Sequence, residues 1–274
     1  MDYKKIVQEA IEQNHVSNIE LFCGKDEIGI NNYLNGQQYA YVRTVHDINR
    51  MVPKEKKILE IGSFFGVVSI ALKKCGYSVY ALDIPEFFSS EPLRKLYVDN
   101  DIPFTGLNLR KSPLPYESSY FDCVILCEVL EHLNFNPLPV LLEINRVLKE
   151  GGIIYIGMPN LASIHRRIAL LMGRSIHNPI DDFLKQLDRN TNMIVGIHWR
   201  EYTMIETREI TEKMGFALEQ SYYFIGNREG RNLIKKMIIS FLNKFFPSLL
   251  PCQVVVGRKI NNPSYDFWYT DANS

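Results

Sequence analysis

The middle of the chain alternates short apolar segments with amphipathic segments, a pattern that predicts a parallel sheet covered by helices. Short runs rich in β-branched residues predict strands, and apolar residues spaced by three or four predict helices. The expected strands are Lys57–Ile61, Tyr77–Leu82, Phe104–Leu107, Phe121–Cys127 and Ile153–Met158. The expected helices are Val67–Lys74, Pro92–Asn100 and Leu138–Lys149, the last ended by Gly151-Gly152. Strands that alternate with helices of this size favour right-handed βαβ units.

The last third of the chain predicts two more strands, Phe216–Phe224 and Cys252–Gly257, as an antiparallel pair that closes the sheet after a helix near Glu206–Met214. Between the two strands, Arg231–Phe246 carries a broad apolar stripe with several lysines. Such a helix packs on the protein, contacts a second subunit or lies on a membrane surface. We expect packing, with a homodimer through this helix as one form of it.

Composition and charge exclude several classes of protein. The 274 residues carry 31 Lys+Arg and 31 Asp+Glu, so no basic excess favours a nucleic-acid partner. The first residues are polar and no apolar run is long enough to span a bilayer, so we expect a soluble, cytoplasmic protein without a stable membrane anchor. The 5 cysteines are scattered and form no C-x-x-C pair, which indicates a reducing compartment and no metal site.

The carboxyl ends of the expected strands carry the candidate chemistry, because parallel sheets bind ligands there. Glu60-Ile61-Gly62-Ser63-Phe64-Phe65-Gly66 is a glycine-containing turn between a strand and a helix. Phe64 and Val67 stand where a dinucleotide fingerprint requires glycine, which disfavours NAD. Asp83 ends the next strand, where an acid can accept both ribose hydroxyls. Taken alone, the glycine-containing turn could bind no ligand and Asp83 could be a solvated acid. Taken together, the two features favour a bound nucleoside.

These residues resemble the class I S-adenosylmethionine-dependent methyltransferases, in particular the small-molecule and ubiquinone-type members. The resemblance covers about Lys57 to Pro159, with a weaker match at His198–Phe216. Its ordered blocks are Leu59–Gly66, Ala81-Leu82-Asp83, Leu114–Val124 and Glu128-Val129-Leu130-Glu131-His132-Leu133. It implies a Rossmann-like, seven-stranded, mostly parallel sheet with helices on both faces. Two positions depart from the family pattern: Phe64 replaces a glycine, and Asn108 replaces an Asp.

The resemblance also implies a domain organisation and a cofactor site. The expected parts are an N-terminal helical cap (1–53), a methyltransferase domain (54–260) with a lid insertion (about 160–205) and a helical insertion (about 228–250), and a C-terminal tail (261–274). S-adenosylmethionine is the implied cofactor: Gly62 and Gly66 pass under its methionine part, Asp83 holds the ribose and Glu128 lines the sulfonium pocket. The implied cofactor-binding residues are Glu60, Gly62, Ser63, Gly66, Asp83, Asn108, Leu109 and Glu128.

Methyl transfer to a weakly nucleophilic hydroxyl needs a base, and the lid is expected to supply it. His198 is the preferred base or acceptor-orienting residue, with Tyr202 nearby and His132 as a further candidate. Alternatively, His198 and Tyr202 only anchor the lid, and His132 forms a local hydrogen bond. Arginines in the lid favour an anionic acceptor, although a solvated helix face explains them too.

The sequence therefore predicts a methyltransferase acting on a small molecule, with oxygen as the acceptor atom and a sugar, sugar phosphate or polysaccharide-pathway intermediate as the acceptor. A natural-product or quinone methyltransferase is the alternative enzyme. A catalytically silent S-adenosylmethionine-binding protein and an NAD oxidoreductase are the alternatives from other classes.

Overall fold

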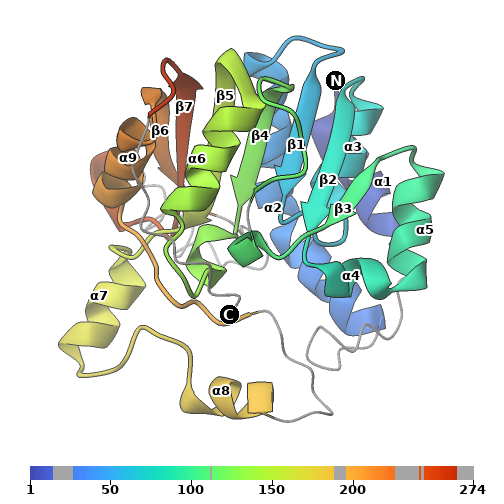
Figure 1. Cartoon of the computed structure of the whole chain (residues 1–274). Helices are drawn as coiled ribbons and strands as arrows, with labels where there is room; N and C mark the ends of the chain where they lie inside the picture. Colours follow the sequence, from blue (N-terminus) through green and yellow to red (C-terminus); the bar gives the residue numbers. More distant parts are fainter. Residues whose placement is uncertain (15–26, 112, 188–195, 226–240, 242–243, 264–274) are drawn as a thin grey trace, which may run out of the picture.

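The chain folds around one mixed sheet whose strand order is β3-β2-β1-β4-β5-β7-β6 (Figure 1). The computed structural model describes residues 1–14, 27–111, 113–187, 196–225, 241 and 244–263, the side chains of 27–29 and 186 excepted. The strands are β1 Lys57–Ile61, β2 Ser78–Asp83, β3 Phe104–Gly106, β4 Phe121–Cys127, β5 Leu148–Pro159, β6 Phe216–Phe224 and β7 Cys252–Lys259. Neighbours from β3 to β5 pair in parallel, and β7 is antiparallel to both β5 and β6. The expected fold is confirmed.

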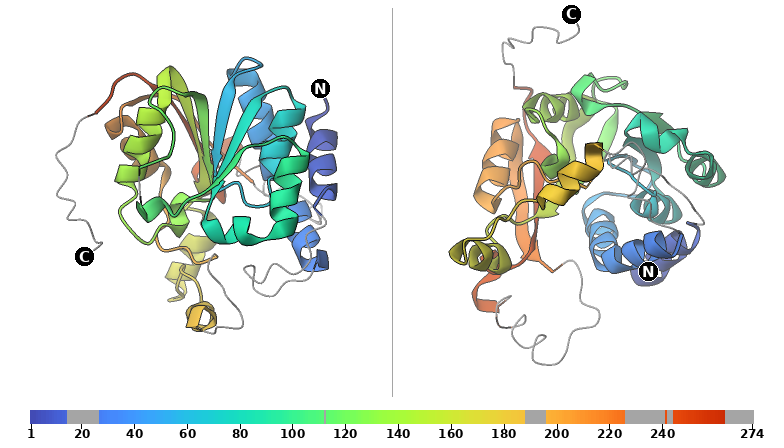
Figure 2. Two further views of the ribbon diagram at one scale, coloured as in Figure 1. Left: turned by 45° about the vertical axis from the view of Figure 1, so that its right-hand side comes forward. Right: turned by 90° about the horizontal axis from the view of Figure 1, so that it is seen from below.

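Helices cover both faces of the sheet (Figures 1 and 2). They are α1 Tyr3–Glu12, α2 Glu27–Met51, α3 Val67–Lys74, α4 Pro85–Ser89, α5 Glu91–Asp99, α6 Leu138–Val147, α7 Ile164–Leu171, α8 Ile180–Leu187 and α9 Met204–Lys213. Three 3-10 turns are η1 Leu109–Lys111, η2 Leu130–His132 and η3 Pro247–Leu249. Within the described part of the chain, no helix is both long enough and apolar enough to cross a membrane.

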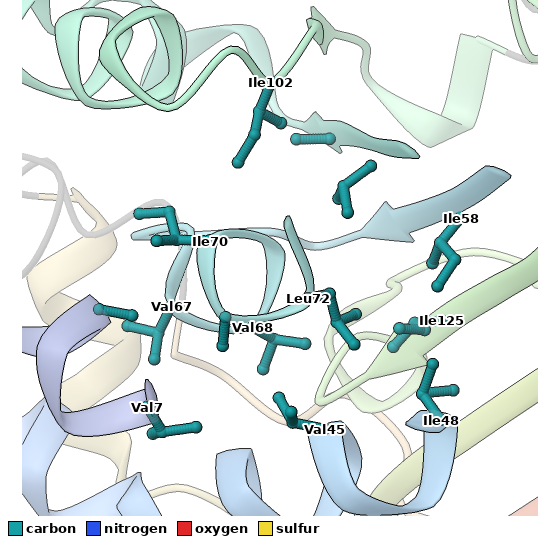
Figure 3. Close-up of a cluster of buried hydrophobic side chains, with 14 of the residues drawn as sticks. Val7, Val45, Ile48, Ile58, Val67, Val68, Ile70, Leu72, Ile102 and Ile125 are labelled. Carbon is teal, nitrogen blue, oxygen red and sulfur yellow. The ribbon is translucent and has the colours of Figure 1, made fainter. Parts of the chain in front are cut away.

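Two hydrophobic clusters form because neighbouring strand residues point to opposite faces. Ile58 of β1 and Ile125 of β4 belong to the cluster that contains α1, α2 and α3, part of which is drawn in Figure 3. Leu59 and Leu126, one position further along each strand, belong to the second cluster, which contains α6. Buried on both faces, these strands read as continuous apolar runs.

Most expected elements agree with the structure, and the end of one helix was wrong. Residues 138–149 were expected to be helical, but α6 ends at Val147 and β5 begins at Leu148. Leu148 pairs with Phe121 of β4, so sheet pairing takes over before the two glycines are reached. The segment Arg231–Phe246 lies mostly outside the described residues, so its proposed packing and dimer role stay predictions.

The carboxyl ends of β1 and β4 meet where the strand order reverses. The chain runs from β1 to β2 and β3 on one side, then returns to place β4 on the other side of β1. Ligands bind at such switch points in open α/β sheets. The helices α7 and α8 of the expected lid lie on this side of the sheet, below it in Figure 1 and across it in the right-hand view of Figure 2.

A buried acid fixes α2 to the sheet. Asp47 is only 3% exposed, and its Oδ2 accepts hydrogen bonds from the hydroxyls of Tyr155 on β5, at 3.2 Å, and of Tyr222 on β6. The two hydroxyl oxygens lie 3.1 Å apart. Hydrogen bonds to a charged group in a dry environment are among the stronger ones, so this cluster sets where α2 lies.

We expect Asp47→Ala to lower the free energy of unfolding by about 2–3 kcal/mol, because two buried hydroxyls lose their charged acceptor. Urea unfolding followed by circular dichroism measures the change. Arg50→Ala is the matched control: Arg50 also joins α2 to β6, through an exposed 3.0 Å bond to Gln220, and its loss should cost less than about 0.5 kcal/mol. Equal losses in the two variants would show that apolar packing alone holds the helix.

Candidate active site

Two glycines shape the turn after β1. Gly62 has φ +76°, and a Cβ there would lie 2.2 Å from a methyl carbon of Val129. Gly66 has φ +70°, and its Cβ would lie 3.1 Å from the ring of Tyr97. The Tyr97 hydroxyl lies 2.9 Å from Ser63 Oγ and 3.1 Å from the carbonyl oxygen of Phe64. Only glycine fits at both positions, and the turn between them is fixed by hydrogen bonds.

Asp83 joins the ends of β1 and β2. Its Oδ2 accepts a hydrogen bond from the backbone N–H of Phe64, and its Oδ1 accepts one from Ile84, both at 2.7 Å. Phe64 has φ +49°, a left-handed conformation that costs roughly 1–2 kcal/mol for such a residue. Each carboxylate oxygen keeps a second lone pair, so Asp83 can hold this backbone and still accept two hydroxyls.

The ring of Phe64 lies against other aromatic rings. Its centroid is 4.1 Å from that of Phe65, 5.2 Å from that of Phe87 on α4 and 6.0 Å from that of Tyr33 on α2, all edge-to-face. A phenylalanine is therefore accommodated where dinucleotide-binding turns carry glycine. The aromatic contacts also connect the turn to α2, a neighbour that the sequence analysis did not predict.

Burial raises the pKa of both strand-end acids. The pKa of Glu60 rises to about 8 because it is buried, although the Ser69 hydroxyl donates to it. The pKa of Asp83 rises to about 6 for the same reason, opposed by its two backbone donors. The hydrogen bond from Ser69 connects Glu60 to the beginning of α3. This contact supports the expected role of Glu60 in orienting the glycine-containing turn after β1.

Asn108 and Leu109 follow β3, at the expected adenine end of the site. Asn108 is exposed, and its Oδ1 already accepts a 3.0 Å hydrogen bond from the N–H of Arg110. Leu109 packs against the second hydrophobic cluster. Contact of either residue with adenine stays a prediction.

Two carboxyl groups lie close together beyond β4. Glu128 has φ +54° and donates its N–H to the carbonyl of Gly157 at 2.8 Å. The residue is exposed at this edge of the sheet, and desolvation of its carboxyl group by the surrounding protein raises its pKa to about 7. Glu131 is fully buried on η2, and burial followed by the charge of Glu128 raises its pKa well above the usual range. Left-handed backbone at Glu128 and Phe64, on neighbouring strand ends, is the kind of strain that collects at functional sites.

His132 and His198 are brought together by the lid. Their rings meet edge-to-face with centroids 4.8 Å apart. Nδ1 of His132 lies 2.9 Å from the carbonyl oxygen of Ile197, and burial lowers its pKa to about 4. Nδ1 of His198 lies 2.6 Å from Glu201 Oε1. A carbonyl and a carboxylate can only accept, so each ring donates from Nδ1 and keeps Nε2 available.

Glu201 was not among the expected site residues, yet it organises the lid. Its side chain is 4% exposed and also pairs with Arg166. Arg166 further donates to the carbonyl of Ile176 at 3.0 Å, so it is committed within the lid. Arg200 pairs with Glu206 at 3.1 Å. These pairs weaken the argument that the lid arginines bind an anionic acceptor.

Tyr202 is 2% exposed and lies in the second hydrophobic cluster. Its carbonyl accepts hydrogen bonds from the N–H of Leu161, at 3.1 Å, and from the side chain of Gln253 on β7, at 2.8 Å. This geometry supports the anchoring alternative for Tyr202 rather than contact with an acceptor.

Two tyrosines of α2 face the site, which the sequence analysis missed. Burial and the charges of Glu128 and Glu131 raise the pKa of Tyr33 to about 12. Tyr41, two helical turns later, has its pKa raised by burial, Tyr33, Glu60 and Glu128. A spacing of eight residues places both on one face of a helix, a signal present in the sequence.

Comparison with known proteins agrees with this geometry. Residues 59–156 match a family model described as a methyltransferase domain. No curated protein sequence matches the chain.

Solved structures share the fold at low identity. A methyltransferase in complex with the Haloferax volcanii Trm112 activator aligns with TM-score 0.57 and 16% identity, over 82% of this chain and 91% of that one. An S-adenosylmethionine-dependent methyltransferase from Methanosarcina mazei aligns with TM-score 0.54 and 18% identity, over 78% and 97%. One from Archaeoglobus fulgidus aligns with TM-score 0.53 and 16% identity, over 83% and 99%.

The sheet order is that of an open α/β fold with a switch point between β1 and β4, and the strand-end acids lie at this edge of the sheet. The matched model makes the class specific: residues 59–156 carry a methyltransferase domain, and S-adenosylmethionine is its methyl donor. The residues present fit this cofactor. Asp83 keeps lone pairs for two hydroxyls, and the acids Glu60, Asp83 and Glu128 gather on one side of a site that must hold a cationic sulfonium.

We expect Asp83→Asn to weaken S-adenosylmethionine binding roughly 10- to 150-fold, because a charge-assisted pair to the ribose is lost. In this prediction the ribose hydroxyls would donate to the ionised carboxylate, and the pKa of Asp83 without cofactor is about 6. Wild-type affinity should therefore fall as the pH drops below about 6, by at most about tenfold per pH unit, and the Asn variant should lack this component.

Calorimetry between about pH 5 and pH 8 measures the affinity of wild type and of Asp83→Asn for S-adenosylmethionine. Subtracting one pH profile from the other removes the contributions of Glu60 and Glu128. Asp99→Asn, an exposed acid on α5 paired with Lys95, is the control and should bind normally. Wild-type affinity in a folded Asp83→Asn protein would remove Asp83 from the site.

Proposed function

We propose that this enzyme methylates an oxygen atom of a small molecule, with a sugar, sugar phosphate or polysaccharide-pathway intermediate as the acceptor. The supporting observation is the pair of imidazoles of His132 and His198, each with Nε2 available, beside Glu128 at the carboxyl end of β4. A hydroxyl is a poor nucleophile, so a site for it needs a group that can hold or remove its proton.

Cofactor binding rests on the strand-end residues. Gly62, Ser63 and Gly66 would lie along the methionine part, Asp83 would accept the ribose hydroxyls, and Asn108 with Leu109 would contact the adenine. Glu128 would line the sulfonium pocket, and Glu60 would hold the turn. S-adenosylmethionine supplies an electrophilic methyl group when bound.

The lid residues act on the acceptor. Nε2 of His198 orients the acceptor hydroxyl or accepts its proton, and Glu201, at 2.6 Å from Nδ1, holds the ring in position. His132 gives the acceptor a second nitrogen to donate to. Closure of the lid over the strand ends would exclude water from the transfer, which mainly requires alignment and desolvation.

A natural-product or quinone acceptor is the second candidate. The observation that favours it is the aromatic wall formed by Phe64 with Tyr33, whose ring centroids lie 6.0 Å apart. A flat aromatic acceptor would stack there, whereas a sugar would use mainly the polar groups of the lid. A cytoplasmic location and an anionic acceptor stay predictions.

We expect His198→Ala to lower turnover by about 10²- to 10⁴-fold while S-adenosylmethionine affinity changes less than about twofold. Production of S-adenosylhomocysteine with panels of sugar phosphates, sugar nucleotides and phenols first identifies an acceptor, and turnover is then compared. His177→Ala, an exposed histidine of the same lid, should behave like wild type.

A different result would support the anchoring alternative. If His198→Ala lowers the melting temperature and weakens cofactor binding along with turnover, His198 holds the lid and does not act on the acceptor. If no acceptor in either panel yields product, the proposed acceptor classes are wrong.

A further inference from the structure

Three potential ligands converge beyond the carboxyl end of β4. Glu131 and His132 are neighbours on η2, and His198 reaches them from the segment that precedes α9. One carboxylate oxygen and one nitrogen from each ring all lie within 4.8 Å of one another. Two imidazoles and a carboxylate from separate parts of the chain are a common ligand set for divalent transition metals.

The histidines are held as metal ligands usually are. His132 donates from Nδ1 to the carbonyl of Ile197 at 2.9 Å, and His198 donates from Nδ1 to Glu201 at 2.6 Å. Metal-binding histidines typically donate their second ring N–H to a carbonyl or carboxylate, which fixes the tautomer and the ring orientation. These bonds use Nδ1 of each ring and leave Nε2 as the nitrogen for a metal.

Glu131 supplies an independent observation. Its side chain is 0% exposed, and neither carboxylate oxygen has a hydrogen-bond partner among the described residues. Buried polar groups are almost always paired, and a buried carboxylate without a partner is costly. The neighbouring side chain is a second acid, Glu128, so a cation bound beside the rings of His132 and His198 would give these carboxyl groups a positively charged partner.

We propose that Glu131, His132 and His198 bind a divalent transition-metal cation such as Zn²⁺, Mn²⁺ or Fe²⁺. The two nitrogen ligands disfavour Mg²⁺, which prefers oxygen. The sequence analysis expected no metal because it considered cysteine spacing, whereas these ligands become neighbours only when the lid folds back onto η2.

The ligand atoms must move closer together to bind one ion. In a tetrahedral site, atoms about 2.0–2.2 Å from the cation lie roughly 3.5 Å apart, so a separation of 4.8 Å must shorten by about 1.3 Å. His198 can move, since its side chain is 27% exposed. Three protein ligands leave coordination positions open, and Glu128 lies near one side of the cluster.

The cation's use rests on the proposed function, whereas its binding does not. A bound divalent cation supplies Lewis-acid polarisation of an acceptor oxygen. With Nε2 of His198 engaged, this residue orients the acceptor through the cation and is not itself the proton acceptor. Turnover lost in His198→Ala then reflects a lost ligand.

Cobalt titration of the full-length, chelator-treated protein tests the site without any acceptor. We expect one Co²⁺ per chain with visible ligand-field absorption, displaced by Zn²⁺ and not by Mg²⁺. Glu131→Gln, His132→Ala and His198→Ala should each weaken binding more than about 100-fold, and Glu201→Gln by about 10- to 100-fold, as loss of an outer-shell partner does. His177→Ala should bind like wild type.

Thermal unfolding separates lost ligands from lost structure. Glu131→Gln keeps the size and polarity of the buried side chain, so without metal it should melt close to wild type, yet Zn²⁺ should no longer raise its melting temperature. Absence of 1:1 binding by wild type, or equal affinity in wild type and the three ligand variants, would overturn the proposal.

The two proposals fail differently. Metal binding without a methylated acceptor would contradict only the proposed function. Product formation that survives chelation, with no cobalt binding, would contradict only the metal site.

Discussion

Crowding of carboxyl groups at one edge of the sheet is the constraint on which the site depends. Glu60, Asp83, Glu128 and Glu131 gather there, and burial raises the pKa of each. In the part of the chain that the structure describes, no lysine or arginine forms an ion pair with any of them. Burying several carboxyl groups together without a positive charge costs free energy, so the site favours binding of a cation. A sulfonium cofactor meets this condition and, beside Glu131, so would a divalent metal.

Backbone strain and helix docking place these groups. Phe64 and Glu128 take left-handed conformations at neighbouring strand ends, and hydrogen bonds to Asp83 and Gly157 hold them. On the other side, Asp47 fixes α2 so that Tyr33 faces the acids. The site therefore depends on polar contacts between elements that are far apart in the sequence.

Local signals explain what the sequence could predict. The bounds of β1, α3, β4 and β6 agree with the sequence pattern. β1 and β4 are buried on both faces and Gly66 and Gly76 bracket α3, whereas β6 is an edge strand that is only partly buried. The end of α6 was missed because pairing of Leu148 with Phe121 is a long-range effect. Tyr202 looked like a site residue by resemblance, but its burial becomes visible only once β7 is in place.

The lid shows why the chemistry was harder to predict than the fold. His198 was named as a candidate, but its partner Glu201 and the buried Glu131 were not. Their places in the site depend on contacts between the lid and η2, which the sequence pattern does not reveal. Trp199 N–H donates to the carbonyl of Glu131 at 2.7 Å, so the backbone joins the same two segments that the side chains do. The contact of residues 198–201 with η2 and the assembly of the His–Glu cluster thus depend on each other, and a cation bound there would stabilise both.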